Sequence, residues 1–291
     1  MSKVDKVKGT IIKGIAGFYY VKSGETVYRC KARGIFKERG IKPAVGDKVE
    51  MEIIEGNDDS LITEILPRKN SFIRPALANV DCFAVVASCA RPKPVFQTID
   101  RFLVMAEKAG TDVVLCISKC DLKGKQDLLK EVYEPIYPVV CIDKDSQQGI
   151  LKLKELIAGK TVALAGASGA GKSSILNRII PDAGMETGSI SEKSQRGKHT
   201  TRHSQLFEIG DDAGTMVFDT PGFTSFDILQ TDEEELPLLY PEIAAFAGKC
   251  RYDNCRHLAE PECAVKEALK RGEIHPLRYE SYKIQMEELR K

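Results

Sequence analysis

The sequence has no apolar run long enough to act as a signal peptide or to span a bilayer, no internal repeat and no low-complexity tract. A chain without such segments is expected to be cytosolic and to have no membrane partner. Charge of one sign is not in excess either, since 43 basic and 42 acidic residues give a net charge of +1. Overall charge therefore does not indicate a nucleic-acid partner, and local charge has to be considered. The length of 291 residues is typical of two or three domains.

Residues 1–70 have the pattern of a small β-domain. Short segments rich in β-branched and aromatic residues alternate with turns that contain glycine or proline. We expect strands at Val7–Ile15, Gly17–Val21, Thr26–Ala32, Lys48–Ile54 and Leu61–Ile65. Five short strands in this length predict an OB-fold barrel. The segment has 14 basic and 10 acidic residues, a net charge of +4, which fits an RNA-binding barrel and a solvated β-domain equally well.

Residues 71–230 alternate between apolar runs and helical periodicity, which predicts an α/β domain with a mainly parallel sheet and helices on both faces. Strands are expected at Val80–Ser88, Asp112–Ser118, Pro138–Ile142 and Thr161–Ala165, and helices at Thr98–Lys108, Lys125–Val132 and Ile150–Ile157. Leu206–Ile209 and Met216–Phe218 flank a turn with two glycines and predict a hairpin at the sheet edge. Residues 231–291 are predicted to form a mainly helical domain, with helices at Pro261–Lys270 and Pro276–Arg290.

A phosphate-binding loop follows the apolar strand at 161–165. The motif G-x-x-x-x-G-K-[ST] is complete, and a helical run begins at Ser174: Gly166-Ala167-Ser168-Gly169-Ala170-Gly171-Lys172-Ser173. Glycines allow the backbone N–H groups to turn toward phosphate oxygens, and the following helix N-terminus favours negative charge. Lys172 would reach the β- and γ-phosphates, and Ser173 would bind Mg²⁺. The motif predicts a nucleoside triphosphate site without specifying the base.

Asp219-Thr220-Pro221-Gly222 comes after the predicted strand at 216–218. An Asp at this distance after a phosphate loop is suited to hold Mg²⁺ through water, and the Gly222 N–H is suited to sense the γ-phosphate. The intervening segment 191–203 is polar and basic, and we expect it to order when γ-phosphate and Mg²⁺ bind. Thr200 and Thr201 are both candidates for its Mg²⁺ ligand. A solvated loop without a ligand role is the alternative.

Ser118-Lys119-Cys120-Asp121 follows the predicted strand at 112–118. GTPases carry Asn-Lys-x-Asp at such a strand end, where the Asp accepts hydrogen bonds from guanine N1–H and its amino group. Adenine cannot supply that pair, so Asp121 predicts guanine specificity and disfavours a P-loop ATPase. A serine hydroxyl retains one polar contact but lacks the paired capacity of the Asn amide. We therefore expect weaker binding with guanine preference retained, and a plain surface turn is the alternative interpretation.

The base-reading motif precedes the phosphate loop, whereas GTPases usually have the opposite order. A parallel sheet tolerates this permutation, because all nucleotide loops lie at the carboxyl ends of strands. With this order and the segments at 166–174, 197–201 and 219–223, the chain resembles the RsgA (YjeQ/YloQ) family of circularly permuted GTPases that depend on the small ribosomal subunit. The resemblance implies an OB-fold that contacts ribosomal RNA and a GTPase that the subunit stimulates in late assembly. Ser118 departs from the family's Asn.

Four of the potential metal ligands lie within fourteen positions: Cys250, Cys255, His257 and Cys263. Three thiolates and one imidazole complete a tetrahedral Zn²⁺ site with no open position, so we expect one structural zinc per chain. The alternative is buried thiols beside a surface His. The other six cysteines are scattered, and several lie in apolar runs where a thiol behaves as a small hydrophobic group.

Phe223 follows Gly222, where water-positioning GTPases commonly carry Gln. A phenyl ring cannot orient water by hydrogen bonding, so slow intrinsic hydrolysis is expected until a partner completes the site. His199 is a candidate to orient the water, although a solvated His in a polar loop is the favoured interpretation. The leading function is therefore a GTPase stimulated by the small subunit. The alternative is an rRNA-binding factor, expected like the enzyme to be a monomer, in which GTP orders the protein and hydrolysis is incidental.

Overall fold

The computed structural model describes residues 4–38, 40–54, 59–180, 204–223 and 231–290. The chain divides into two structural units that are interleaved in sequence. Unit 1 comprises Met1–Cys82, Ile157–Leu164 and Ser173–Phe223, and unit 2 comprises Phe83–Leu156, Ala165–Lys172 and Thr224–Lys291. The predicted domain limits, 1–70, 71–230 and 231–291, stay predictions, because these units follow contacts in space rather than chain order.

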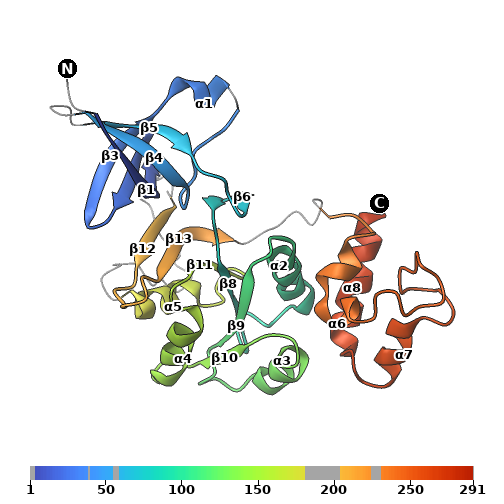
Figure 1. Ribbon diagram of the computed structural model, residues 1–291. Coiled ribbons are helices and arrows are strands. Elements are labelled where there is room, and N and C mark those ends of the chain that lie inside the picture. Colours follow the sequence, from blue (N-terminus) through green and yellow to red (C-terminus); the bar gives the residue numbers. More distant parts are fainter. Residues whose placement is uncertain (1–3, 39, 55–58, 181–203, 224–230, 291) are drawn as a thin grey trace, which may run out of the picture. The chain divides into compact units, whose positions relative to one another are not determined.

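The N-terminal part of unit 1 is the expected five-stranded barrel, drawn in blue and cyan in Figure 1. Its strands are β1 (Val4–Ile15), β2 (Phe18–Ser23), β3 (Thr26–Ala32), β4 (Lys48–Ile54) and β5 (Ser60–Ile65). They follow the order β1-β2-β3-β5-β4, and β4 pairs back onto β1 to close the barrel. The β3–β5 pair is parallel and the others are antiparallel. This closure leaves the barrel without an open edge between β1 and β4.

Side chains that alternate along the strands fill the barrel. Its buried core consists of Ile11, Val21, Cys30, Phe36, Val49, Met51 and Ile62. Phe36 comes from α1 (Gly34–Glu38), a short helix between β3 and β4 that the sequence pattern did not predict. At the barrel exit, Arg68 binds the fully buried Asp47 through two hydrogen bonds of 2.7 and 2.8 Å. These two charge-assisted hydrogen bonds fix the direction in which the chain leaves β5.

Two strands from late in the chain extend the barrel's sheet. β12 (Gln205–Glu208) and β13 (Met216–Phe223) form the predicted antiparallel hairpin. Its predicted place at a sheet edge is wrong, because β12 also pairs with β1 at Lys13↔Gln205. An ion pair between Lys22 on β2 and Glu208 supports this contact. Within unit 1 the strand order is therefore β11-β13-β12-β1 and onward through the barrel, with β11 at Thr161–Ala165.

A small hairpin connects the barrel to the rest of the chain. β6 (Ser71–Ile73) and β7 (Ala76–Ala78) pair in antiparallel fashion across a turn at Arg74-Pro75. Each strand has three residues, too few for a period-2 pattern to stand out in the sequence. The hairpin was for that reason not predicted.

Unit 2 contains the alternating strands and helices that the sequence predicted. Strands β8 (Cys82–Ser88), β9 (Asp112–Ser118) and β10 (Val139–Ile142) lie in the order β10-β9-β8, and the β10–β9 pair is parallel. Every residue of β8 is buried, as expected for a strand covered on both faces. The helices between and after the strands are α2 (Phe96–Lys108), α3 (Gln126–Tyr133) and α4 (Gln148–Ile157).

The regular secondary structure described in the C-terminal part of unit 2 consists of helices, which flank an irregular loop at 248–263. It contains a 3₁₀ helix at Leu236–Leu239, α6 (Pro241–Ala244), α7 (Ala264–Lys270) and α8 (Pro276–Leu289). In the turn before the 236–239 helix, the Asp232 carboxylate accepts hydrogen bonds from the N–H groups of Glu234 and Glu235. Figure 1 shows α8 beside α2, and their residues are in contact. None of the described helices has the length and apolar character needed to cross a bilayer.

Candidate functional site

The phosphate loop connects β11 to α5 (Lys172–Ile179), as its sequence context predicted. Gly166, Gly169 and Gly171 have φ angles of 142°, 74° and 103°, in the region that side chains rarely adopt. A Cβ atom on Gly166 would lie 2.2 Å from the carbonyl oxygen of Val86 on β8. Only glycine permits the loop to start this close to the neighbouring backbone.

Lys172 lies at the phosphate loop with its ammonium group turned onto it. The Nζ atom donates to the carbonyl oxygens of Gly166 at 2.6 Å and Ala167 at 2.9 Å. Burial lowers the pKa of Lys172 to about 8, because partial desolvation disfavours the charged form. The charge that Lys172 brings to the phosphate loop therefore depends on pH near neutrality.

Ser118 links the base-reading segment to the phosphate loop. Its hydroxyl donates to the carbonyl oxygen of Ala170 at 2.5 Å, and it lies 3.4 Å from the carbonyl oxygen of Ala87. The side chain is buried, and a Cβ atom on Gly171 would touch it at 3.4 Å. In a trans peptide the C=O and the next N–H point in opposite directions. Anchoring the Ala170 carbonyl at Ser118 therefore turns the Gly171 N–H away from Ser118.

Lys119 and Asp121, in the same segment, form hydrogen bonds to other loops. Lys119 has a φ of 61°, and its Nζ donates to the carbonyl oxygens of Gly169, at 2.9 Å, and of Arg91. Asp121 is exposed, and its Oδ1 accepts a hydrogen bond of 3.2 Å from the Lys144 N–H. The structure thus brings Ser118 and Lys119 to the phosphate loop and places Asp121 beside the turn after β10.

Sequence reasoning missed two loops of this site. Residues 89–92 follow β8, and Pro92 lies 3.6 Å from the position that a Cβ atom on Gly169 would take. Residues 143–146 follow β10, where the Asp143 carboxylate accepts from the N–H groups of Asp145 and Ser146. Both loops come directly after predicted apolar strands. Because ligand loops in α/β sheets lie at the carboxyl ends of strands, this position was the available signal.

The predicted Mg²⁺ and γ-phosphate residues are described only in part. Asp219 is half-buried on β13 and is in register with Gln205 on β12. The strand was expected to end at Phe218 but continues to Phe223, so Asp219 and Gly222 lie within β13 rather than in a turn after it. Ser173 and Ser174 lie in the first turn of α5. His199, Thr200 and Thr201 lie outside the described residues.

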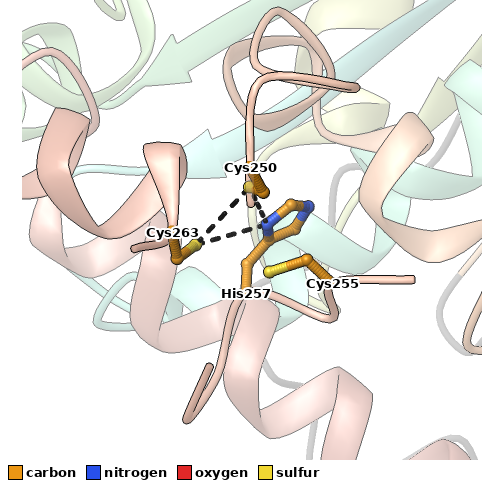
Figure 2. Close-up of side chains that lie close together, drawn as sticks. All are labelled: Cys250, Cys255, His257 and Cys263. Atoms are coloured by element: carbon orange, nitrogen blue, oxygen red, sulfur yellow. Dashed lines mark hydrogen bonds between the residues drawn. The ribbon is translucent and has the colours of Figure 1, made fainter. Parts of the chain in front are cut away.

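The four predicted metal ligands converge in the C-terminal part of unit 2 (Figure 2). Their ligand atoms all lie within 4.8 Å of one another. The Sγ atoms of Cys250 and Cys263 are 3.9 Å apart, and each lies 3.5 Å from Nδ1 of His257. Burial raises the pKa of Cys255 to about 12 and lowers the pKa of His257. A buried set of three thiols and a neutral imidazole could hold a metal ion, which would displace the thiol protons.

Neighbouring residues shape the loop that carries His257. The Glu260 carboxylate accepts hydrogen bonds from the N–H groups of Arg256 and Leu258, both at 2.8 Å. These two bonds flank His257, whose φ of 59° is uncommon for a residue with a side chain. From α8, the Tyr279 hydroxyl donates to the His257 carbonyl oxygen at 2.6 Å. The backbone is thus held on both sides in the conformation that turns the imidazole toward the thiols.

Two family models match the barrel and the segment that contains the nucleotide motifs. The model for the RsgA N-terminal domain matches residues 8–62, and the model for the RsgA GTPase matches residues 65–229. A protein named small ribosomal subunit biogenesis GTPase RsgA from Agathobacter rectalis is 46% identical, covering 97% of this chain and 98% of that protein. The protein of the same name from Alkaliphilus metalliredigens is 44% identical and covers 98% of both chains.

Two solved structures have the same fold over nearly the whole chain. YjeQ from Thermotoga maritima superimposes with a TM-score of 0.83 at 35% identity, covering 98% of this chain and 99% of that one. YloQ, described as a circularly permuted GTPase, gives a TM-score of 0.80 at 34% identity and covers 98% of this chain and 96% of that one. With its barrel, its permuted order of nucleotide motifs and its Cys/His cluster, this chain belongs to the RsgA family of circularly permuted GTPases.

Proposed function

We propose that this chain hydrolyses GTP to GDP and phosphate while it acts in late assembly of the small ribosomal subunit, and that the subunit stimulates the reaction. The contacts of Ser118 and Lys119 with the phosphate loop are the main support for this proposal, because they join the segment proposed to read guanine to the segment proposed to bind the triphosphate. The names of the relatives, biogenesis GTPases of the small ribosomal subunit, supply the assembly role.

Guanine would be read by Asp121 and Lys119. Asp121 has an exposed carboxylate, which suits it to accept hydrogen bonds from guanine N1–H and the amino group. The Lys119 stem, held by its Nζ bonds to Gly169 and Arg91, would pack along the base. The Ser118 hydroxyl is bonded to the phosphate loop, so we assign it a positioning role rather than a contact with the base.

Phosphates would be bound by the backbone of residues 166–171 with Lys172 and Ser173. Mg²⁺, which neutralises charge on the β- and γ-phosphates when bound, would be held by Ser173 and, through water, by Asp219. Gly222 would respond to the γ-phosphate. Thr200 or Thr201 is proposed as the second hydroxyl ligand, and His199 as the weakest candidate to orient water.

We propose that the Cys/His cluster holds a structural Zn²⁺. Tetrahedral zinc with bonds of about 2.3 Å to sulfur and about 2.0–2.1 Å to nitrogen separates two sulfurs by about 3.8 Å and a sulfur from a nitrogen by about 3.5 Å. The observed separations of 3.9 and 3.5 Å fit these values. Four protein ligands leave no position for substrate, which supports a structural role.

The barrel is proposed as a contact surface for ribosomal RNA. Its segment has a net charge of +4, and basic side chains supply the sequence-independent part of RNA affinity. Phe18 on β2 has Arg29 and Lys31 of β3 at 5.2 and 5.1 Å from its ring. An aromatic ring among cations is a surface on which RNA bases and phosphates can bind together.

The decisive experiment measures GTP and ATP turnover with and without purified small subunits. We expect slow turnover of GTP alone, because Phe223 cannot orient water, and a large increase when subunits are added. ATP should be hydrolysed at background rates in both conditions. Subunit binding without stimulated GTP turnover would instead support the assembly factor in which hydrolysis is incidental, and equal turnover of ATP would contradict guanine specificity.

A further inference from the structure

An arginine with no exposed surface lies between helices from both parts of unit 2. Arg278 is on α8, and its side chain is fully buried. Its Nη1 donates to Oδ1 of Asp100 on α2 at 2.6 Å. Its Nε and Nη2 donate to the carboxylate oxygens of Glu242 on α6, at 2.7 and 3.2 Å. One guanidinium thus binds two carboxylates from two other helices.

Aromatic rings enclose the same guanidinium. Its carbon lies 4.5 Å from the ring centre of Tyr240, and 5.7 and 5.9 Å from those of Tyr133 and Tyr137. Burial alone would lower the pKa of Arg278, but the two carboxylates raise it well above its ordinary value. The cation is therefore permanent, and its hydrogen bonds to the two carboxylates compensate for its removal from water.

The partners of Arg278 come from segments far apart in the chain. Asp100 lies on α2 and Tyr133 ends α3, and both belong to the strand-and-helix part that carries the base-reading segment. The Tyr133 hydroxyl donates to the same Asp100 oxygen, at 2.8 Å. Glu242 and Arg278 belong to the C-terminal helical part. A change in the placement of these parts would have to separate buried charges.

α8 also contacts the metal-binding loop. The Tyr279 hydroxyl donates to the His257 carbonyl, and the Tyr282 hydroxyl donates to the Arg256 carbonyl at 2.7 Å. Tyr282 is fully buried. Residues 278–282 of α8 therefore connect the loop that carries the Cys/His cluster to α2 through hydrogen bonds, and Arg278 also contacts the Tyr133 ring of α3.

We propose that α8 is a rigid strut, anchored by Arg278, that keeps the Cys/His cluster at one fixed distance from α3 in the GTP-bound and the GDP-bound protein. Chain order alone suggests the opposite, since Asp219–Gly222 precede the C-terminal part and could move it when the nucleotide changes. Because these charges are buried, any movement of the C-terminal part should carry α2 and α3 along with it. The inference rests on nucleotide binding by this chain, which the test checks separately.

The test measures a distance across the strut in the intact protein. Ketone-bearing amino acids at Asp127 on α3 and Asp253 in the metal-binding loop, both exposed positions, are spin-labelled so that the native thiols stay unmodified. Electron–electron dipolar spectra are recorded with GDP and with a non-hydrolysable GTP analogue. We expect the same mean distance and width in both states. A mean that shifts by more than the width overturns the proposal.

Binding of each nucleotide is verified by displacement of a fluorescent GDP, so that a failure of GTP binding is distinguished from a failure of the strut. Arg278→Met should broaden the distance distribution at least twofold. Arg101→Gln is the matched control, because Arg101 joins α2 to Glu288 of α8 through a partly exposed ion pair, and it should leave the width unchanged. A narrow distribution in folded Arg278→Met contradicts the role of Arg278. If that variant does not fold, the wild-type comparison still decides.

Discussion

At the scale of single residues, Ser118 shows that a position in a recognition motif can act through the backbone of a neighbouring loop. The sequence predicted that its hydroxyl would keep one polar contact, and the structure identifies a partner, the Ala170 carbonyl. A residue pattern specifies which chemistry is available at a strand end. It does not specify which of several nearby acceptors the hydroxyl will bind, because that depends on a loop 52 residues away in the chain.

Ser118→Ala should weaken binding of every ligand that uses the phosphate loop. Loss of one neutral hydrogen bond costs about 1 kcal/mol, or about fivefold in affinity. GDP and pyrophosphate should lose the same factor, measured by competition against a fluorescent GDP. Asp121→Asn is the matched control, and it should weaken GDP but not pyrophosphate. If Ser118→Ala affected GDP alone, the hydroxyl would act through the base.

Lys172 predicts a pH dependence of nucleotide binding. Burial lowers its pKa to about 8, so the side chain is charged below that pH and neutral above it. Phosphate binds the charged form, and above pH 8 a proton must therefore be taken up on binding. GDP affinity should be nearly constant from pH 7 to 7.5 and should then fall, approaching tenfold per pH unit by pH 9. Isothermal titration in two buffers would measure both affinity and proton uptake; constant affinity would refute the assignment.

At the scale of elements, the metal-binding loop and α8 share contacts but differ in how far they depend on the metal ligands. The loop at 250–263 depends on the Cys/His cluster and on local bonds such as those of Glu260. α8 contributes Tyr282 and Met286 to a buried apolar cluster, besides Arg278. The two elements should consequently respond differently to removal of a metal ion.

Chelation should loosen the loop at 250–263 much more than α8. We expect amide hydrogen exchange to accelerate at least tenfold in the loop after treatment with a strong zinc chelator, because metal binding supplies folding energy there. Exchange in α8 should change by less than about threefold, because its apolar and ionic contacts persist. Added Zn²⁺ should restore the loop. Unchanged exchange in the loop would show that no structural metal had been present.

At the scale of the whole molecule, the sequence predicted the order of elements well and their distant pairings poorly. β9 and β11 have the predicted bounds, since continuous apolar runs mark them, and β3, which lies between two turns that contain glycine, has its predicted bounds too. The pairing of β12 with β1 was missed, because a strand pattern indicates which face is buried and not which strand lies alongside. The motifs identified the site residues that lie on described segments. The two loops after β8 and β10 were missed, because they carry no motif of their own.

The whole protein should bind small subunits more tightly in its GTP state than in its GDP state. Hydrolysis removes the γ-phosphate to which Asp219–Gly222 are predicted to respond, and a difference in contacts is needed for any shift in affinity. Cosedimentation with a non-hydrolysable GTP analogue and with GDP should differ by at least tenfold. Equal affinities would mean that hydrolysis does not drive release.

The long first strand also has a consequence for the order of events during synthesis. β1 can pair with β4 once the first 54 residues are available, and β5, which ends at Ile65, completes the barrel. Its contact with β12 joins Lys13 to Gln205, a separation of about 190 residues. Gln205 is about 140 residues beyond the end of the barrel at Ile65, so at about 5–20 residues per second it follows the barrel by about 7–28 s. During its first seconds the new barrel therefore lacks the strand that pairs with β1 at Lys13. In that period a chaperone or a second nascent chain could compete for the place that β12 will take.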